Sequence, residues 1–562
     1  MMTDKLSIRK RIRRVVLYSV AILVVTAAVL FSLARVFISD VEAYRLDIEQ
    51  IASAFLEHPV KIESMDARII GMTPTLVFNR VRLLDKTGKS ELVSFEQAQL
   101  SIAILTSLRE EKFVPKELVI AGTNLAITRN KTGKIQIQGL DILQLDETAL
   151  PLSGGQTNEL AEWLFRRGHI ALQNSSVIWK DMQRGGVTRQ FDNINMQLFN
   201  KRDKHVLSGE ISLPLQLGNQ LEFVLDIKGD IQQPANWGGE FYVRGDAINL
   251  AEWQKELPEK KGFGISSGIL DIELWGELQE GRLTQLSGDA SVHQVLAKAP
   301  FVRGTVDFRM LGGLFDYRAN DKEQVLAVER LQVIRGNEVW PESRIRLHKR
   351  ISKDGEPDEV EMLADQFRLQ DISQLLLKTK LLPRSQHKRL QQMQPQGEVR
   401  NLNLQVRTKN DEFIAPFFMQ AEFEQLAIRP SGKLPGINGT NGTVWTNSEQ
   451  GHVNIHSSYA SFDAPTLFRA PLKLQQLNGV LHWHKQPQGW QFLADNIQAS
   501  NFDLKTVSSL QLDIPITDAS PYLDLQVAFS DGYARQASAY VPVVMMGRPL
   551  VMWLELAIMG GR

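Results

Sequence analysis

Apolar and polar residues alternate along most of the chain, which is the pattern of β-strands with one apolar face. The clearest example is GEISLPLQLGNQLEFVLDIKGD, residues 209–230, in which we predict two antiparallel strands joined by a turn at residues 218–219. Either a protein core or a bound apolar molecule could cover the apolar face of this hairpin. Its apolar positions are Ile211, Leu213, Leu215, Leu217, Leu221, Phe223, Leu225 and Ile227.

Similar alternating segments recur to the C-terminus, as at Leu270, Ile272 and Leu274, and turn signals separate many of them. Helical patterns are few and short. Three resemble one another, at residues 158–168, 248–258 and 369–383, and each ends at glycine or proline. The prediction is a mostly β fold with one long, curled antiparallel sheet and a few short helices. Tandem β-sandwiches are the alternative, but they would need more regular repeats and linkers.

The N-terminal sequence predicts a membrane-spanning segment. Residues 5–14 read KLSIRKRIRR, and residues 15–34 carry no charge. Twenty helical residues cover roughly the 30 Å of a bilayer core. We therefore predict a cytoplasmic basic segment at 1–14 and a transmembrane anchor at 15–37, with all later residues on the far side. A cleaved signal peptide ending near residue 34 is the alternative.

Residues 38–58 follow the predicted anchor, with apolar positions at the spacing of an amphipathic helix that ends at Pro59. This helix could lie on the membrane surface, plug the membrane end of a groove, or cap the sheet. Residues 59–562 form the predicted β-region.

Composition narrows the function classes. Lysine plus arginine and aspartate plus glutamate balance at 64 each among 562 residues, so net charge gives no indication of nucleic-acid binding. The chain has no cysteine, which excludes disulfides, thiolate zinc sites and a cysteine nucleophile. Hydrophobic residues make up 43%, as in a folded chain.

Two motifs resemble sites of known chemistry. Residues 264–268 fit the G-x-S-x-G pattern of a nucleophile elbow, but a predicted strand follows them where the elbow requires a helix. His482 and His484 share one face of a strand, with His452 and His456 upstream, whereas zinc needs three or four convergent ligands. We therefore expect no catalytic residues, no metal site and no cofactor, and the chain is not expected to be an enzyme.

Several stretches, in order, resemble the YhdP-like family of AsmA-like, bridge-like lipid transfer proteins. They include YRLDIEQIASAFLEHPVKIESMDARIIGMTPTLVFNRVRLLD at 44–85, WLFRRGHIALQNSSVIWKD at 163–181 and SPYLDLQVAFSDGYARQASAYVPVVMMGRPLVMWLELAIMGGR at 520–562. The similarity spans nearly the whole chain. Family members continue well beyond the stretch that ends at Arg562, so this chain is expected to correspond to their N-terminal portion.

The resemblance implies a single-pass inner-membrane protein with a cytoplasmic N-terminus and its bulk in the periplasm. It implies a long sheet curled into an open hydrophobic groove that carries phospholipids between the inner and outer membranes and supports the outer-membrane permeability barrier. The expected partners are phospholipids, the inner membrane, and outer-membrane or periplasmic proteins, with no nucleic acid. The alternative is an anchored envelope scaffold or assembly protein without lipid transport. The candidate groove lining is the apolar set of the 209–230 hairpin together with Leu270, Ile272 and Leu274.

Overall fold

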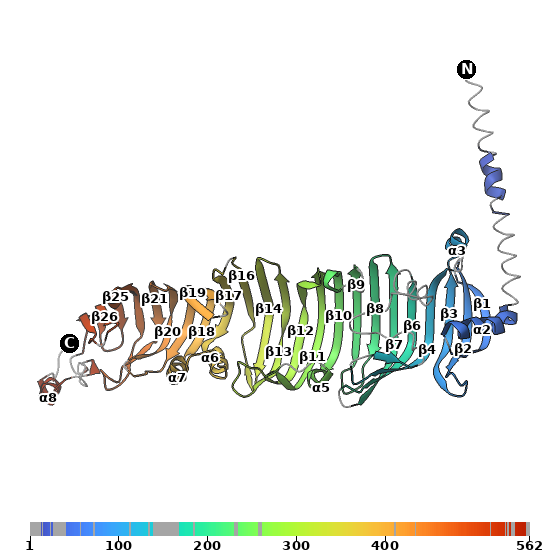
Figure 1. The fold of residues 1–562 in the computed structure, drawn as a ribbon. Coiled ribbons are helices and arrows are strands. Elements are labelled where there is room, and N and C mark those ends of the chain that lie inside the picture. Colours follow the sequence, from blue (N-terminus) through green and yellow to red (C-terminus); the bar gives the residue numbers. More distant parts are fainter. Residues whose placement is uncertain are drawn as a thin grey trace, which may run out of the picture. The chain divides into compact units, whose positions relative to one another are not determined.

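The computed structural model describes most of the chain, and the fold is mostly β, with short helices between some of the strands (Figure 1). The described residues are 13, 15–22, 24–25, 41–56, 58–70, 73–111, 114–132, 135–138, 168–183, 186–229, 234–256, 261–353, 355–409, 412–432, 434–517, 519–533, 536, 539–540 and 546–557. The chain forms two compact units. Unit 1 is Met1–Gly245 with Leu278–Arg282, and unit 2 is Asp246–Glu277 with Leu283–Arg562.

Unit 1 contains one long sheet in which the strands pair in the order β1-β2-β3-β4-β6-β7-β8-β9, with the short β5 on β4. Neighbouring strands are antiparallel except β4 and β6, which are parallel. The strands are β1 (Val60–Ile70), β2 (Thr73–Leu84), β3 (Glu91–Ile102), β4 (Pro115–Arg129), β5 (Ile135–Ile137), β6 (His169–Asp181), β7 (Val187–Lys201), β8 (Lys204–Ser212) and β9 (Gln220–Lys228). β10 (Gly238–Asn249) spans the boundary between the two units, and η2 (Pro234–Asn236) precedes it.

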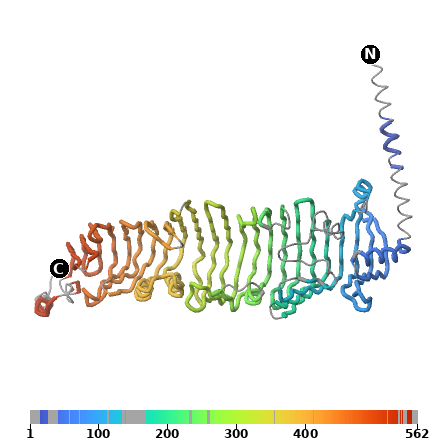
Figure 2. Tube along the Cα trace, viewed as in Figure 1, coloured from blue at the N-terminus to red at the C-terminus, as the bar shows by residue number. Residues whose placement is uncertain are grey.

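Unit 2 contains a second run of antiparallel pairs, and Figure 2 traces its strands from green to red. Its strands pair in the order β12-β13-β14-β16-β17-β18-β19-β20-β21-β24-β25-β26-β27. The strands are β11 (Gly264–Gln279), β12 (Arg282–Lys298), β13 (Val306–Ala319), β14 (Glu323–Arg335), β15 (Glu338–Val339), β16 (Ser343–Arg350), β17 (Asp358–Arg368), β18 (Gln396–Lys409), β19 (Glu412–Ile428), β20 (Gly436–Asn447), β21 (Gln450–Ser458), β22 (Ser461–Asp463), β23 (Leu472–Lys473), β24 (Gln476–Gln486), β25 (Gly489–Ser500), β26 (Lys505–Pro515) and β27 (Tyr522–Ser530).

Besides η2, the described helices from residue 41 onward are short, and several of them follow a strand. They are η1 (Val41–Tyr44), α2 (Arg45–Leu56), α3 (Ile104–Glu110), α5 (Leu250–Glu256), α6 (Leu369–Leu377), α7 (Arg384–Met393) and α8 (Arg548–Ala557). Two of the three similar helical patterns appear as α5, directly after β10, and α6, directly after β17. The third pattern, at 158–168, lies outside the described residues apart from Gly168. The prediction of a mostly β, antiparallel fold with few short helices is confirmed.

Bulges bend many strands near their middle. At these points non-glycine residues adopt positive φ, as at Asn174 of β6 (45°) and Gln425 of β19 (52°). The neighbouring strand satisfies the backbone amides that the bulges expose. The amide N–H of Asn174 donates to Asn195 Oδ1 (3.0 Å), and that of Gln425 donates to Asn441 Oδ1 (2.6 Å). Asparagine side chains of the neighbouring strands therefore stabilise these two bulges.

Helix α2 covers the free edge of β1, which among the described strands pairs only with β2 (Figure 1). Three side chains of η1 and α2 accept backbone N–H groups of this edge. Glu49 accepts from Ile62 (2.9 Å), Ser53 from Val60 (2.8 Å) and Glu42 from Met65 (2.6 Å). Below them, Ile48, Ala52 and Leu56 pack on the core cluster formed by Val60, Ile62, Val81, Leu83 and Val93. Of the three roles considered for this helix, these contacts favour a cap on the sheet.

The predicted cytoplasmic segment at 1–14, apart from Arg13, lies outside the described residues, as do residues 23 and 26–37 of the predicted anchor and residues 38–40 and 57 of the predicted amphipathic helix. Among the residues that are described, no helix has both the length and the apolarity needed to cross a bilayer.

Candidate functional site

The 209–230 hairpin forms, but its turn lies elsewhere than predicted. β8 ends at Ser212 and β9 begins at Gln220, so the prediction that Leu213, Leu215 and Leu217 lie on the first strand is wrong. These leucines form the turn. Pro214 has no N–H to give to a ladder, and its carbonyl accepts the N–H of Leu217 (2.7 Å), which closes the turn.

The three turn leucines have different environments. Leu217 is 1% exposed and Leu213 is buried with it, whereas Leu215 is 91% exposed at the tip of the turn. Burial of Leu213 and Leu217 explains why the turn lies before residues 218–219, although a Gly-Asn pair is itself a good turn signal. Leu215 stands apart from the apolar face of the two strands.

The register of β8 and β9 places the remaining predicted side chains on one face. Ile211 lies opposite Leu221, Gly209 opposite Phe223, and Leu207 opposite Leu225. Directly opposed residues of an antiparallel pair point to the same side of the sheet. Ile211, Leu221, Phe223, Leu225 and Ile227 therefore share a face, as predicted, and Leu207 joins them.

The same face continues across unit 1 as two rows of apolar residues, which together we call the unit 1 band. Each row crosses eight strands, with one residue from each strand, and residues that pair in register follow one another in it. The first row is Ala67, Leu76, Leu100, Leu118, Ile170, Leu198, Leu207 and Leu225; the second is Met65, Phe78, Ala98, Ile120, Leu172, Met196, Gly209 and Phe223. Neither row contains a polar residue.

A matching row crosses unit 2, and we call it the unit 2 band. It follows paired residues across thirteen strands, from β12 to β27, and Thr446 is its one polar member. The row is Leu286, Tyr317, Leu326, Leu347, Met362, Leu404, Met419, Thr446, Gly451, Trp483, Phe492, Leu512 and Leu523. On the other face of the sheet, the neighbouring row mixes apolar and polar residues. It runs through Ala327, Arg346, Leu363, Asn403, Gln420, Trp445, His452 and His482.

Both bands contain a glycine beneath an aromatic ring. A Cβ atom on Gly209 would lie 2.8 Å from a ring carbon of Phe223, and one on Gly451 would overlap the indole of Trp483. The ring of one strand therefore lies across the next strand where that strand has no side chain. This fills the rows with apolar surface and leaves no gap at the glycines.

The band side chains are partly exposed. Of the sixteen unit 1 members, Met65 is fully buried and the others are half-buried. Among the described elements, the helices with substantial strand contacts are η1 and α2, on β1, and α6, on β17 and β18. A packed core would bury such leucines and phenylalanines almost completely. The bands are therefore apolar surfaces that neighbouring side chains shield only in part.

Leu270, Ile272 and Leu274 alternate along β11, so they lie on one face of that strand, and all three are half-buried. Most band members are not among the lining residues predicted from the sequence; Met196, Leu404 and Trp483 are examples. Alternation within each strand could have identified them. Only the register shows that they continue one another across the sheet.

The other motifs do not form a reactive site. Ser266 lies within β11, which continues well past the G-x-S-x-G motif. His452 lies opposite His482 on adjacent strands, with ring centroids 5.8 Å apart, and Trp445 stacks on His452. Within the described ranges, no three histidine or carboxylate side chains are grouped as metal ligands would be.

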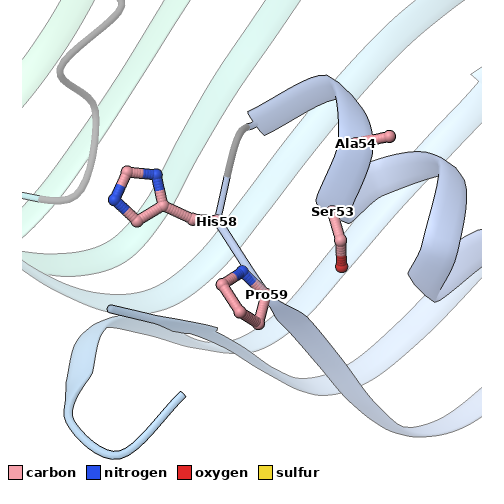
Figure 3. Close-up of a pocket in the computed structure, with 4 residues that line it drawn as sticks. All are labelled: Ser53, Ala54, His58 and Pro59. Carbon is pink, nitrogen blue, oxygen red and sulfur yellow. The ribbon is translucent and has the colours of Figure 1, made fainter. Parts of the chain in front are cut away.

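A shallow depression at the junction of α2 and β1 is lined by Ser53, Ala54, His58 and Pro59 (Figure 3). Its polar groups already have protein partners. The Ser53 hydroxyl accepts the Val60 N–H, and His58 Nδ1 lies 3.0 Å from the carbonyl oxygen of Leu56. The depression therefore belongs to the edge cap, and the bands are the stronger candidate for a functional surface.

Comparison with known proteins agrees with the resemblance found in the sequence. The family described as "YhdP protein" matches residues 1–562. The chain is 22% identical to the "Intermembrane phospholipid transporter YhdP" of Escherichia coli (strain K12), over 98% of this chain. The chain spans 42% of the length of that relative. No solved structure matches the chain. That relative is named as a transporter, which agrees with the expectation that this chain is not an enzyme.

Proposed function

The chain belongs to the YhdP protein family, and on that premise we propose that it carries phospholipids between the inner and outer membranes, with their acyl chains on the apolar bands. The predicted segment at 15–37 anchors it in the inner membrane with its bulk in the periplasm. Through this traffic the protein supports the outer-membrane permeability barrier. Phospholipid and the inner membrane are the proposed partners, together with envelope proteins at the far end.

The continuity of the unit 1 band is the observation that carries this proposal. Drawing two acyl chains of about 16 carbons each into water would cost on the order of 25 kcal/mol of free energy, at about 0.8 kcal/mol per CH₂. A surface that offers apolar side chains on every strand offsets much of this cost at each position. Strands lie about 4.8 Å apart, so an acyl chain moving along a row contacts the next strand before it leaves the previous one.

The proposed acyl-chain contacts of the hairpin are Ile211, Leu221, Phe223, Leu225 and Ile227, and Leu207 is added from the register. Leu270, Ile272 and Leu274 are proposed for β11. The buried turn residues Leu213 and Leu217 are proposed to support this surface from the turn. Leu215, at the exposed tip, is not included. Head groups remain in water beside the band and need no deep pocket.

A vesicle transfer assay separates this proposal from an anchored scaffold. The full chain is reconstituted into donor vesicles that hold a fluorescent phospholipid, and transfer to protein-free acceptor vesicles is followed. We expect transfer well above that of donors without protein, because the bands shield the acyl chains. Equal transfer with and without the chain would contradict lipid carriage and favour the scaffold.

A further inference from the structure

Helix α3, between β3 and β4, exposes its apolar side, whereas an ordinary surface helix buries that side. Its apolar residues point outward, with Leu105 84% exposed, Leu108 73% exposed and Ile104 also exposed. Thr106 and Ser107, on its polar face, are the more buried residues. A surface helix of a soluble domain buries its apolar side, so this arrangement indicates that α3 contacts an apolar partner.

Hydrogen bonds hold α3 in this orientation. The Ser107 hydroxyl accepts the backbone N–H of Val114 (3.0 Å), and Ala103 N–H donates to the carbonyl of Val114 (3.0 Å). After the helix, Glu111 adopts φ of 52° and its N–H donates to the carbonyl of Ser107. Turning the leucines inward would break these bonds at the helix base. The apolar face is therefore fixed outward by the local structure.

Another exposed apolar residue lies at the same ends of the strands. Ile70, at the end of β1, is exposed, and Thr73, at the start of β2, accepts a hydrogen bond from the ammonium group of Lys116 at the start of β4 (2.9 Å). α3 projects beside these strand ends (Figure 1). We define the α3 patch as Ile104, Leu105 and Leu108.

We propose that the α3 patch inserts into the surface of a lipid bilayer. The described helical residues 15–22 and 24–25 of the same unit are nearly all apolar and exposed on every side of the helix, which suits a hydrocarbon environment and not a single protein contact. Exposed Leu46 and Ile51 on α2 add further apolar surface to this unit. A bilayer next to unit 1 would cover all of these surfaces with one partner.

The position of α3 gives the insertion a consequence for lipid traffic, and this consequence rests on the proposed function. α3 joins β3 and β4, and both strands contribute to the unit 1 band, through Ala98 and Leu100 and through Leu118 and Ile120. Insertion of α3 would hold the ends of these two strands at the membrane surface. A phospholipid leaving the leaflet would then meet the band without crossing open water.

The absence of cysteine makes a direct test possible. Leu105→Cys and Leu108→Cys variants of the full chain each carry one nitroxide spin label and are reconstituted into vesicles of phosphatidylethanolamine and phosphatidylglycerol. Collision rates are measured with oxygen, which concentrates in hydrocarbon, and with a water-soluble nickel complex. Leu215→Cys is the matched control, because Leu215 is a 91% exposed leucine of the same unit on a turn outside the patch.

We expect the labels at 105 and 108 to favour oxygen and to be protected from nickel, and the label at 215 to favour nickel. Nickel access at 105 and 108 equal to that at 215 would overturn the insertion. Protection from both oxygen and nickel would also overturn it and indicate a protein partner. Because the readout is depth in the bilayer, loss of lipid transfer with intact insertion would count against the proposed function alone.

Discussion

Replacing Leu207 and Leu225 together with glutamate should abolish phospholipid transfer by the full chain. The two residues lie directly opposite each other on β8 and β9, so the double change places two carboxylates side by side in the unit 1 band. Carboxylates hold water around them, because stripping an ionised group of water is very costly. The acyl chains would have to cross a hydrated gap in the band.

The expected effect is large. If three methylenes of each acyl chain are exposed at the gap, the barrier rises by about 5 kcal/mol, at about 0.8 kcal/mol per CH₂. That is a slowing of more than about a thousandfold, since each 1.4 kcal/mol is a factor of about ten. The vesicle transfer assay with fluorescent phospholipid measures it directly.

The register supplies a control with the same added charge. Ser208 and Val224 lie opposite each other on the same two strands but on the other face, so Ser208→Glu with Val224→Glu should leave transfer close to that of the unchanged chain. Equal loss of transfer in both double variants would show that charge disturbs the hairpin as a whole, and would contradict a role for the band face.

Replacing Glu49 with alanine should loosen the first edge of the unit 1 sheet. Glu49 is 4% exposed, and its carboxylate accepts from Ile62 N–H (2.9 Å), Arg45 Nη1 (3.0 Å) and Lys61 Nζ (3.2 Å). Removing it leaves a buried N–H and a guanidinium without this partner. The expected loss is about 3 kcal/mol in the free energy that protects β1 from opening.

Hydrogen exchange measures this loss, because β1 amides should exchange about a hundredfold faster in the variant. Asp47→Ala is the matched control, since Asp47 is an exposed carboxylate on the same helix. Similar exchange in the two variants would contradict the assignment of Glu49 as the residue that holds the edge.

Acidification should reproduce part of the stability loss that Glu49→Ala causes. Burial raises the pKa of Glu49, but the hydrogen bond from Ile62 N–H and the charge of Lys61 outweigh it, so the pKa in the folded protein lies below the ordinary 4.5. A carboxyl with a lowered pKa stabilises the fold above its ordinary value and ceases to do so as the pH falls through the folded pKa. The melting-temperature difference between the unchanged chain and Glu49→Ala should therefore narrow below pH 4.5.

Strands and their apolar faces could be predicted from the sequence because alternation is a local property. The pattern Leu221, Phe223, Leu225 and Ile227 predicts both the strand and the face that the structure shows in β9. The turn before it lies earlier than the sequence predicts, because Leu213, Leu215 and Leu217 continue the alternation although Pro214 interrupts the ladder. Tertiary packing buries Leu217 and thereby sets the position of the turn, and no local pattern contains that information.

Bulges leave a weaker trace in the sequence. In β2 the apolar positions run Leu76, Phe78, Val81 and Leu83, and the step of three falls across Arg80, which adopts φ of 50°. Phe78 packs on the same cluster that contains Val81 and Leu83. Such steps signal a bend, but the parallel pairing of β4 with β6 has no comparable signal, because the pairing depends on how the chain returns between them.

The candidate site could be predicted only in part. The apolar side of each strand is evident from alternation, whereas the bands exist because register aligns residues far apart in sequence, such as Leu404 with Met362. Gly209 and Gly451 show most clearly what the sequence alone does not reveal about the bands. A glycine in an apolar row suggests a gap, and the aromatic ring that lies across it comes from the next strand.

Photo-crosslinking from the bands tests the central claim most directly. A photoreactive amino acid is placed at Phe223 or Leu404, one in each band, and at their strand neighbours Glu222 or Gln405, which point to the opposite face. Irradiation of membranes that contain the full chain should give phospholipid adducts at 223 and 404 and none at 222 and 405. Adducts to protein alone at 223 and 404, or lipid adducts at equal yield from both faces, would contradict a lipid-carrying band.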